Sequence, residues 1–361
     1  MLGMTRLNAW PPLPPTVYVR RPGQLPFPLQ EEGCRLFALG RHALWHGIRA
    51  LGLESRDEIL VPAYHHGSEV EALARAGLAC RFYAGSDELR PAESELEALV
   101  GPRTRALLLI HYLGFPQEVA RWRRWCDERD LFLIEDAAQA WLARDNGSPV
   151  GSVGDLAIFC LYKTYGFPDG AALVSRRPPV QPPSPANLGA KAIARRHFSW
   201  VRSRTPIVRG TSGVRERFTP ADEFALGEPA TSASRATTFL LRRVATMETA
   251  AVRRENYQML LERLRRRVPR PFDRVPDGAA PFVFPLDTMH KHALLETLSR
   301  HGIHAVDFWS VGHPSHDAES FPAVQERRRR TIGLPVHQEL RRQDVERIAA
   351  VVAEAVEAEH E

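Results

Sequence analysis

The chain has 361 residues, a net charge of +5, 44% hydrophobic residues and 25% charged residues, which is ordinary for a soluble globular protein. This length exceeds the usual size of one domain, so we expect a large domain and a smaller one. No apolar run approaches the ~20 residues that a membrane helix needs, which argues against a membrane protein. The N-terminus lacks the apolar segment of a signal peptide, so we expect a cytoplasmic protein.

The positive charge does not by itself predict nucleic-acid binding. Arginines and tryptophans cluster at residues 121–125, inside a predicted helix over residues 117–129. Val119, Trp122 and Cys126 form an apolar face on that helix, so a solvated opposite face explains the arginines. We expect no nucleic-acid partner.

Neither the cysteines nor the histidines form a pattern typical of a metal site. The four cysteines show no CxxC spacing and fit buried thiols in a reducing cytosol; they are Cys34, Cys80, Cys126 and Cys160. His65 and His66 are adjacent, but neighbours on an extended chain point to opposite sides. We therefore expect no metal.

The N-terminal part combines a proline-rich segment with a helix start. Residues 1–30, with the run Trp-Pro-Pro-Leu-Pro-Pro at 10–15, predict an extended arm that lies on the body or on a partner subunit. A helix is expected from about Gly40 to near Gly52. The small residue at its mouth leaves backbone N–H groups free, and such groups can hold a phosphate.

Strands and helices then alternate with short connections. They are expected in turn at residues 57–62, 69–76, 79–83, 93–99 and 105–110, before the helix at 117–129. This alternation predicts an α/β protein with a parallel, doubly wound sheet.

The most informative stretch is 131–175, where three short apolar runs read as buried strands. The run 131–134 ends in Glu-Asp-Ala-Ala-Gln-Ala, which contains Asp136. Lys163 directly follows the run 156–162, and the run 171–175 follows a Phe-Pro-Asp-Gly turn. Because open α/β sheets place their chemistry at the carboxyl ends of strands, we expect a carboxylate and an amine at neighbouring strand ends.

Lys163 is unusual in this chain, because lysines and arginines together number 48 and only three of them are lysines. Arginine keeps its proton in proteins, whereas a desolvated lysine can become a neutral nucleophile that forms imines. A lysine that snorkels from a strand end is the alternative for Lys163. A helix N-cap is the alternative for Asp136.

The segments 135–140 and 151–155, together with the lysine strand, resemble the DegT/DnrJ/StrS family of pyridoxal phosphate (PLP) sugar aminotransferases. The resemblance runs from about Gly40 to the C-terminus. It implies an α/β type I aminotransferase fold, with a mostly parallel central sheet, helices on both faces and a small α+β C-terminal domain. The domains implied are the arm at 1–30, a PLP-binding domain at 31–245 with an irregular, mobile part at 176–235, and the small domain at 246–361.

The resemblance assigns roles around the cofactor ring. It implies that Lys163 holds PLP as a Schiff base and then shuttles the substrate α-proton as general acid and base. Asp136 would keep the pyridine nitrogen protonated, so that the ring accepts electrons. Gln139 would hydrogen-bond the ring's hydroxyl edge. His66 maps onto the aromatic residue that stacks on the ring, with Tyr64 as the local alternative.

The resemblance also assigns the cofactor phosphate. Gly40, Arg41 and His42 map onto the family's Gly-Thr-x-Ala-Leu helix start, which binds the phosphate. Arg41 replaces the threonine and could serve a phosphate bidentately. Cys160 stands where a serine that helps hold the phosphate is expected, and a thiol is a much weaker donor.

The resemblance implies transfer of an amino group from an amino-acid donor to a nucleotide-linked keto-sugar or to a cyclitol. It also implies that the protein is a cytoplasmic homodimer. An Asn-Tyr-Arg segment that reaches the neighbouring subunit's phosphate in the family is absent here, and residues 231–235 occupy roughly its place. One alternative is other PLP chemistry such as sugar dehydration, whose family branch carries histidine in place of the lysine. Another is a catalytically weak PLP-binding sensor or structural subunit.

Overall fold

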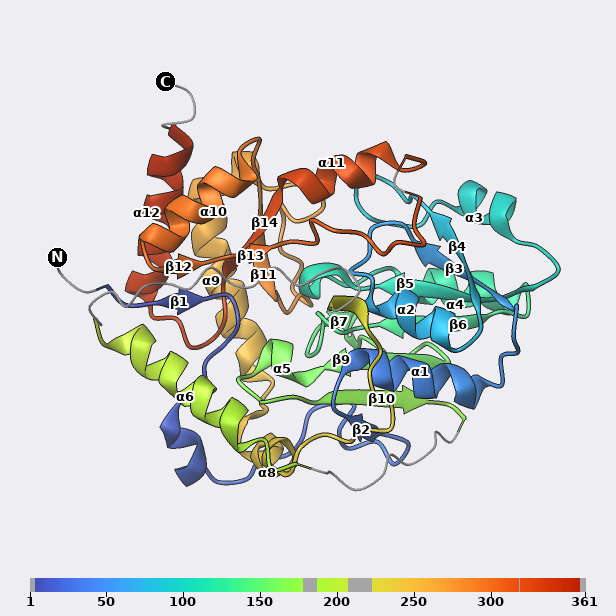
Figure 1. The fold of residues 1–361 in the computed structure, drawn as a ribbon, viewed down its shortest axis with the longest axis horizontal. Coiled ribbons are helices and arrows are strands. Elements are labelled where there is room, and N and C mark those ends of the chain that lie inside the picture. Colours follow the sequence, from blue (N-terminus) through green and yellow to red (C-terminus); the bar gives the residue numbers. More distant parts are fainter. Residues whose placement is uncertain (1–3, 178–186, 207–222, 318, 358–361) are drawn as a thin grey trace.

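The structure is a computed structural model that describes residues 4–177, 187–206, 223–317 and 319–357. Figure 1 shows two parts, a central sheet covered by helices and a smaller C-terminal unit that holds α9, α10 and α12. Within the described residues, no helix is both long and apolar enough to cross a membrane.

The large part is built on a seven-stranded sheet. Its order is β2 (Arg35–Phe37), β10 (Ala171–Ser175), β9 (Leu156–Cys160), β6 (Phe132–Asp136), β5 (Thr104–Ile110), β3 (Glu58–Pro62) and β4 (Ala79–Tyr83). The strands from β9 to β4 pair in parallel, and β10 is antiparallel to both of its neighbours. The expected α/β fold with a mostly parallel sheet is therefore confirmed.

Helices cover both faces of this sheet, as expected. Ile59 and Val61 of β3 belong to the core under α1 (Gly40–Leu51) and α2 (Ser68–Arg75). Leu60 between them belongs to the core under α3 (Glu93–Leu99) and α4 (Val119–Asp127). Successive strand residues point to opposite faces, so a strand covered on both sides is apolar throughout. The predicted apolar face of α4 is confirmed, because its members are buried.

The C-terminal unit follows the long helix α9 (Glu248–Leu264), which comes after α8 (Arg235–Val244). Its antiparallel sheet has the order β11 (Val283–Asp287), β14 (Thr331–Pro335) and β13 (Val306–Asp307). Its helices are α10 (Lys291–Arg300), α11 (Pro322–Arg330) and α12 (Arg342–Glu357). Strand β12 (Ile303–His304) lies outside this sheet, because it pairs with the N-terminal arm.

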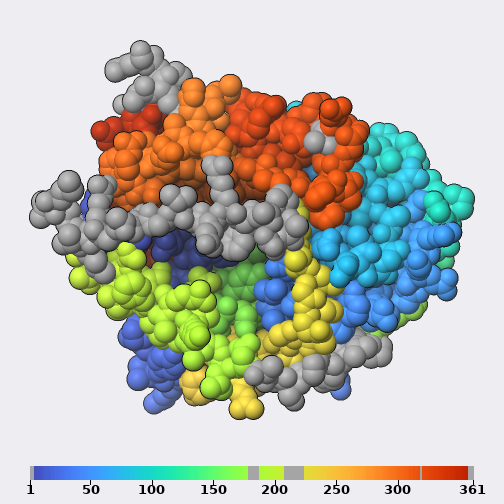
Figure 2. Space-filling view, viewed as in Figure 1, coloured from blue at the N-terminus to red at the C-terminus, as the bar shows by residue number. Residues whose placement is uncertain are grey.

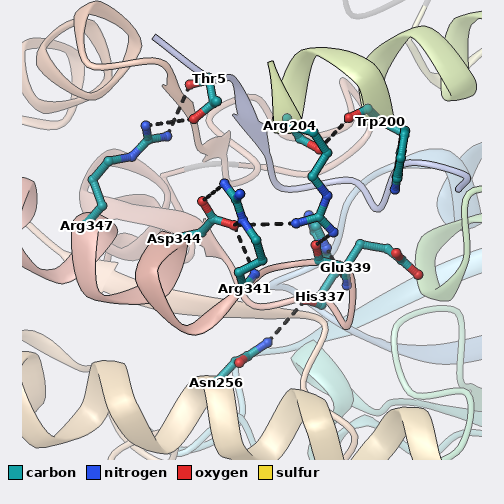
Figure 3. A network of polar contacts seen from close by, with 10 residues as sticks. Thr5, Trp200, Arg204, Asn256, His337, Glu339, Arg341, Asp344 and Arg347 are labelled. Atoms are coloured by element: carbon teal, nitrogen blue, oxygen red, sulfur yellow. Dashed lines mark hydrogen bonds and ion pairs between the residues drawn. The ribbon is translucent and has the colours of Figure 1, made fainter. Parts of the chain in front are cut away.

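The N-terminal arm lies on the body of its own subunit. Its strand β1 (Leu7–Asn8) runs parallel to β12, and the 3-10 turn η1 (Pro15–Val19) follows. Arg347 of α12 donates hydrogen bonds to the hydroxyl and the carbonyl oxygen of Thr5, at 2.9 and 3.1 Å. Figure 3 shows this contact beside Arg204, which donates to the Glu339 carbonyl at 2.9 Å. Polar contacts thus join the arm, the C-terminal unit and the helix that carries Arg204.

The expectation that residues 176–235 are irregular is corrected for one part. Residues Ala190–Arg204 form the helix α6, which packs beside the arm through a hydrogen bond from Asn8 to Ser199 at 2.9 Å. The sequence did not reveal this helix, because its buried side is short and its remaining surface is basic and exposed. The segments 178–186 and 207–222 lie outside the described residues.

The lysine run also differs from the expected single strand. Strand β9 ends at Cys160, and the next four residues form one helical turn, α5 (Leu161–Thr164), which carries Lys163. The backbone N–H of Leu161 donates to the Gly170 carbonyl at 2.9 Å, which closes the connection to β10. A short apolar run does not distinguish a strand from a helical turn, and this explains the error.

Candidate active site

A cavity of about 280 Å³ opens where β6 and β9 end and α1 begins. Seven of the eight predicted cofactor residues line it: Gly40, Arg41, His66, Asp136, Gln139, Cys160 and Lys163. The eighth, His42, does not. Segments that lie more than a hundred residues apart in the sequence therefore meet at one site.

Asp136 ends β6 and is 7% exposed. Its Oδ1 accepts a hydrogen bond from the Ala138 N–H at 2.8 Å, as an N-cap would, while Oδ2 has no donor among the described residues. Burial raises the pKa of Asp136 to about 6, the negative charge of Glu69 adds to this rise, and Lys163 and His111 oppose it. The carboxylate is thus held in place with one oxygen left for a ligand.

Lys163 lies on the neighbouring chain segment, since β6 and β9 pair in parallel with Asp136 opposite Ile158. It lines the cavity and is partly exposed. Within the described residues its amine forms no hydrogen bond and no ion pair. A long cationic side chain usually reaches water or a carboxylate, so an unpaired amine in a cavity is available for chemistry.

Gln139 is fixed by one end of its amide. Its Oε1 accepts a hydrogen bond from the backbone N–H of Leu113 at 2.9 Å. The Nε2 donor has no partner among the described residues, and Gln139 lines the cavity. The residue therefore offers a ligand a donor.

Glu135 connects segments 135–140 and 151–155, both of which carry the family resemblance. It is fully buried, and its carboxylate accepts hydrogen bonds from the backbone N–H groups of Gly151 at 2.8 Å, Val153 at 3.0 Å and Gly154 at 2.5 Å. Burial alone would raise the pKa of Glu135, but the hydrogen bond from His111 and these N–H groups lower it. Glu135 thus folds the segment 151–155 behind the strand end and fixes the position of Asp136.

The aromatic wall of the cavity is formed by His66, with Trp309 from the C-terminal unit beside it. The Nδ1 atom of His66 lies 2.9 Å from the Ser68 hydroxyl, and its Nε2 lies 3.4 Å from a carboxylate oxygen of Glu223. Tyr64, the alternative to His66, is buried behind this wall and does not line the cavity.

The first turn of α1 forms the other end of the cavity. A Cβ atom on Gly40 would lie 2.7 Å from the Cys160 sulfur, so only glycine fits there. The Gly40 N–H and the Tyr162 hydroxyl both interact with this sulfur, and burial raises the pKa of the thiol. Arg41 lines the cavity and donates to the Glu223 carbonyl at 2.8 Å.

His42 points away from the cavity, because successive helical residues face different directions. Its Nε2 lies 2.8 Å from the carbonyl oxygen of Leu226, in the segment that runs along α1. Figure 2 shows this segment, in yellow, beside the blue surface of the α1 region. In this structure His42 thus fixes that segment.

Sequence reasoning missed several residues that line the cavity. They are Trp10 of the arm, Ser68, Glu69, Tyr162, Glu223 and Trp309. Trp10 packs on Tyr162 and Phe282, with ring centroids 6.3 and 5.4 Å apart. The run of prolines after Trp10 indicated an arm that lies on the body, but no local pattern indicates which residues such an arm meets.

Residues 231–235 make contacts within their own subunit. The Ser234 hydroxyl caps α8 and, with the Ser234 N–H, donates to the Asp169 carboxylate at 2.9 and 3.0 Å. Ser232 forms a β-bridge with Phe37. This segment is therefore fixed beside the site by its own chain.

Comparison with known proteins relates this site to a family. The sequence pattern of the DegT/DnrJ/EryC1/StrS aminotransferase family matches residues 34–178. The dTDP-3-amino-3,4,6-trideoxy-alpha-D-glucose transaminase of Streptomyces venezuelae is 35% identical over 144 residues. That match covers 38% of this chain and 38% of the relative, so it spans little more than a third of either protein.

The similarity of fold extends over more of the chain. A DegT DnrJ EryC1 StrS aminotransferase from Brucella abortus has a TM-score of 0.65 at 18% identity, and the match covers 89% of this chain and 85% of that one. The putative sugar aminotransferase Spr1654 from Streptococcus pneumoniae, in its PMP form, has a TM-score of 0.69 at 13% identity, over 99% and 100% of the two chains. At these identities the likeness concerns the fold, and it confirms the expected aminotransferase fold.

The matched sequence pattern contains Gly40, Asp136 and Lys163, and the fold of a family member covers most of the remaining chain. The sequence likeness to the DegT/DnrJ/EryC1/StrS aminotransferase family therefore covers residues 34–178, and over the rest of the chain the likeness is one of fold.

Proposed function

We propose that this protein is a PLP-dependent aminotransferase that moves an amino group from an amino-acid donor to a keto-sugar, nucleotide-linked, or to a cyclitol. The observation that carries the proposal is the amine of Lys163, which no described residue pairs and which shares one cavity with the carboxylate of Asp136 and the amide of Gln139. A buried carboxylate and a lysine without a partner cost stability, and such groups are typical of functional sites.

The residues present fit PLP. Three polar atoms that no described residue binds match the chemistry of its ring. They are the amine of Lys163 for the aldehyde, Oδ2 of Asp136 for the pyridine nitrogen and Nε2 of Gln139 for the hydroxyl edge. At the other end, Arg41 supplies a cation for the phosphate, next to the first turn of α1.

The bound cofactor supplies an electron sink for the substrate carbanion. Asp136, ionised above its pKa of about 6, holds the proton of the ring nitrogen. Lys163 would provide the amine that holds the cofactor, and its free amine would move a proton to and from the substrate carbon. His66 and Trp309 line the cavity, where they would exclude water from that proton transfer.

The acceptor class is inferred from relatives. The Streptomyces venezuelae relative is named for a dTDP-linked amino sugar, and Spr1654 is described as a putative sugar aminotransferase. Trp10 and Trp309 provide aromatic surface that suits the apolar face of a sugar or cyclitol ring. We also propose a homodimer, which the exposed Phe198 and Phe239 on α6 and α8 support.

An absorbance titration tests the proposal. The purified protein is incubated with PLP and then with glutamate or glutamine, and its visible spectrum is recorded at each step. We expect a visible band that the donor bleaches and that Lys163→Ala abolishes. A protein that stays colourless with PLP would overturn the proposal and leave the sensor or structural role.

A further inference from the structure

Arg253 of α9 is a buried cation that forms no ion pair with a carboxylate of the described residues, although the charge of Glu339 acts on it. Its side chain is 2% exposed, and the described residues place no Asp or Glu in an ion pair with it. Burial lowers the pKa of Arg253 to about 10, so the guanidinium stays charged at neutral pH. A buried charge outside an ion pair is costly unless hydrogen bonds compensate it, so the contacts of Arg253 need an explanation.

All three donor nitrogens of Arg253 have neutral acceptors. Nη2 donates to the Thr164 carbonyl at 2.6 Å, and Nη1 donates to the Pro281 carbonyl at 3.0 Å. Nε donates to Oε1 of Gln338 at 3.0 Å. Thr164 immediately follows Lys163 in the single helical turn α5, so Arg253 binds the backbone that carries the reactive amine.

The Thr164 carbonyl receives a second donor from the same cluster. Nε2 of Gln338 lies 3.2 Å from it, so Gln338 bridges Arg253 and the lysine turn. Asn256 holds the segment that precedes Gln338 by donating to the carbonyls of Val336 and His337, both at 3.2 Å. Figure 3 shows Asn256 reaching from α9 to His337.

One face of α9 thus holds the residues after Lys163. Thr249, Arg253 and Asn256 are spaced at i, i+4 and i+7, which places them on the same side of the helix. The hydroxyl of Tyr165 lies 3.1 Å from the Thr249 hydroxyl and donates to the Thr246 carbonyl at 2.8 Å. The C-terminal end of α5 is therefore fixed to α9 by two successive residues.

We propose that Arg253, together with Gln338, is a positioning residue that sets the backbone of Lys163 against the cavity. This inference rests on the proposed function, in which Lys163 is the reactive amine. Arg253 does not line the cavity, so it acts on the reaction only through the turn that it binds. The contacts to Pro281 and Gln338 also tie that turn to the C-terminal unit, whose Trp309 covers the cavity.

The proposal predicts an effect on the reactivity of Lys163 rather than on ligand affinity. A displacement of about 1 Å in a reacting group can cost ~100-fold in rate, so we expect Arg253→Met to slow attachment of PLP to Lys163 by tenfold or more. In Gln338→Met the charge of Arg253 and its bond to Thr164 remain, so a smaller slowing is expected. Arg254→Met is the matched control, because Arg254 also lies on α9 and donates to a carbonyl, that of Ala279 at 2.9 Å.

The experiment follows covalent attachment with time. Each PLP-free protein is mixed with excess PLP and quenched with borohydride at intervals, and the labelled Lys163 peptide is measured by mass spectrometry. Attachment joins the amine nitrogen to the aldehyde carbon, and the aldehyde oxygen leaves as water. Equilibrium PLP binding is measured in parallel by fluorescence, and circular dichroism checks folding.

The expected result is slow labelling in Arg253→Met and Gln338→Met, with wild-type labelling in Arg254→Met and equilibrium binding changed little in all three. Wild-type labelling in a folded Arg253→Met or Gln338→Met protein would overturn the positioning role. Equal slowing in Arg254→Met would also overturn it, since a general loosening of α9 would explain both. If Arg253→Met does not fold, Gln338→Met decides. Failure of the wild-type protein to label Lys163 would refute the proposed function itself.

Discussion

The two ends of the cavity differ in how much of their hydrogen-bonding capacity the protein itself uses. At the ring end, Asp136, Gln139 and Lys163 each keep a polar atom that no described residue binds. At the α1 end, the Gly40 N–H interacts with the Cys160 sulfur and the Arg41 guanidinium binds a carbonyl of the protein. The ring end is therefore prepared for a ligand, whereas the α1 end has to exchange contacts when it binds one.

This difference coincides with where the chain departs from the pattern of the family that it resembles. The three ring-end residues match the pattern of that family, whereas two of the departures from it, Arg41 and Cys160, lie at the end where we propose that the phosphate binds. A site can change one end independently when the other end fixes the reacting atoms. Four changes of sequence or pH, taken from the largest expected effect to the smallest, test this division.

Asp136→Asn should have the largest effect. It removes the charge that, in the proposed function, would hold the ring nitrogen's proton, so we expect turnover to fall by ~100-fold or more, within the range of general acid-base groups. The same change should stabilise the PLP-free protein above pH 6 by ~1–3 kcal/mol, because a buried carboxylate then no longer has to ionise. Turnover and thermal unfolding of the PLP-free protein measure the two effects.

The sign of the second effect follows from the raised pKa. Asp136 has a pKa of about 6 in the folded protein, above its ordinary value of 3.8, so protonation favours folding. The contribution of protonated Asp136 to the free energy of unfolding is complete below its pKa in the unfolded chain, and it is lost as the pH rises through 6. Asp136→Asn should therefore matter for stability at pH 8 and hardly at pH 3.5. Unchanged turnover would show that the ring end does not carry the chemistry.

Arg41→Met tests the phosphate end. A hydrogen bond to a charged group contributes about 1.5–3 kcal/mol, so PLP affinity should fall ~10–100-fold. Arg49→Met is the control, because Arg49 lies on the same helix but stacks on Trp45, with 4.8 Å between its guanidinium and the ring centroid. Fluorescence titration with PLP measures both variants. Equal affinity in Arg41→Met and wild type would show that α1 binds the phosphate without the arginine.

The pH dependence of PLP binding distinguishes the two ends in the unmodified protein. Below pH 6 Asp136 is protonated and must lose its proton to pair with a protonated ring, so affinity should fall by up to ~tenfold per pH unit. The α1 end should add no such dependence, because arginine side chains keep their proton in proteins. Asp136→Asn should flatten the curve between pH 5 and 7, whereas Arg41→Met should shift it without changing its slope.

Much of the fold was predictable because its elements carry local signals. The strand at 79–83 and the helix at 93–99 lie where periodicity places them, and Asp136 and Lys163 share a cavity because parallel strands bring their ends together. Trp10 and Trp309 were not predicted, since they reach the cavity from elements whose packing depends on distant contacts. The place of His42 was missed for another reason, because a helix turns about 100° per residue and cannot direct three successive side chains to one ligand.

Cys160→Ser should give the smallest and most specific change. The thiol is a weak donor, and a hydroxyl at the same place can accept the Gly40 N–H and still donate to a phosphate. A net hydrogen bond contributes about 1 kcal/mol, so PLP affinity should rise ~fivefold. Cys126→Ser is the matched control, because Cys126 is equally buried but lies under α4, away from the cavity, and should lose stability without changing affinity. If Cys160→Ser weakens binding instead, the sulfur is part of a phosphate end adapted to Arg41, and the two departures from the family pattern then belong to one change.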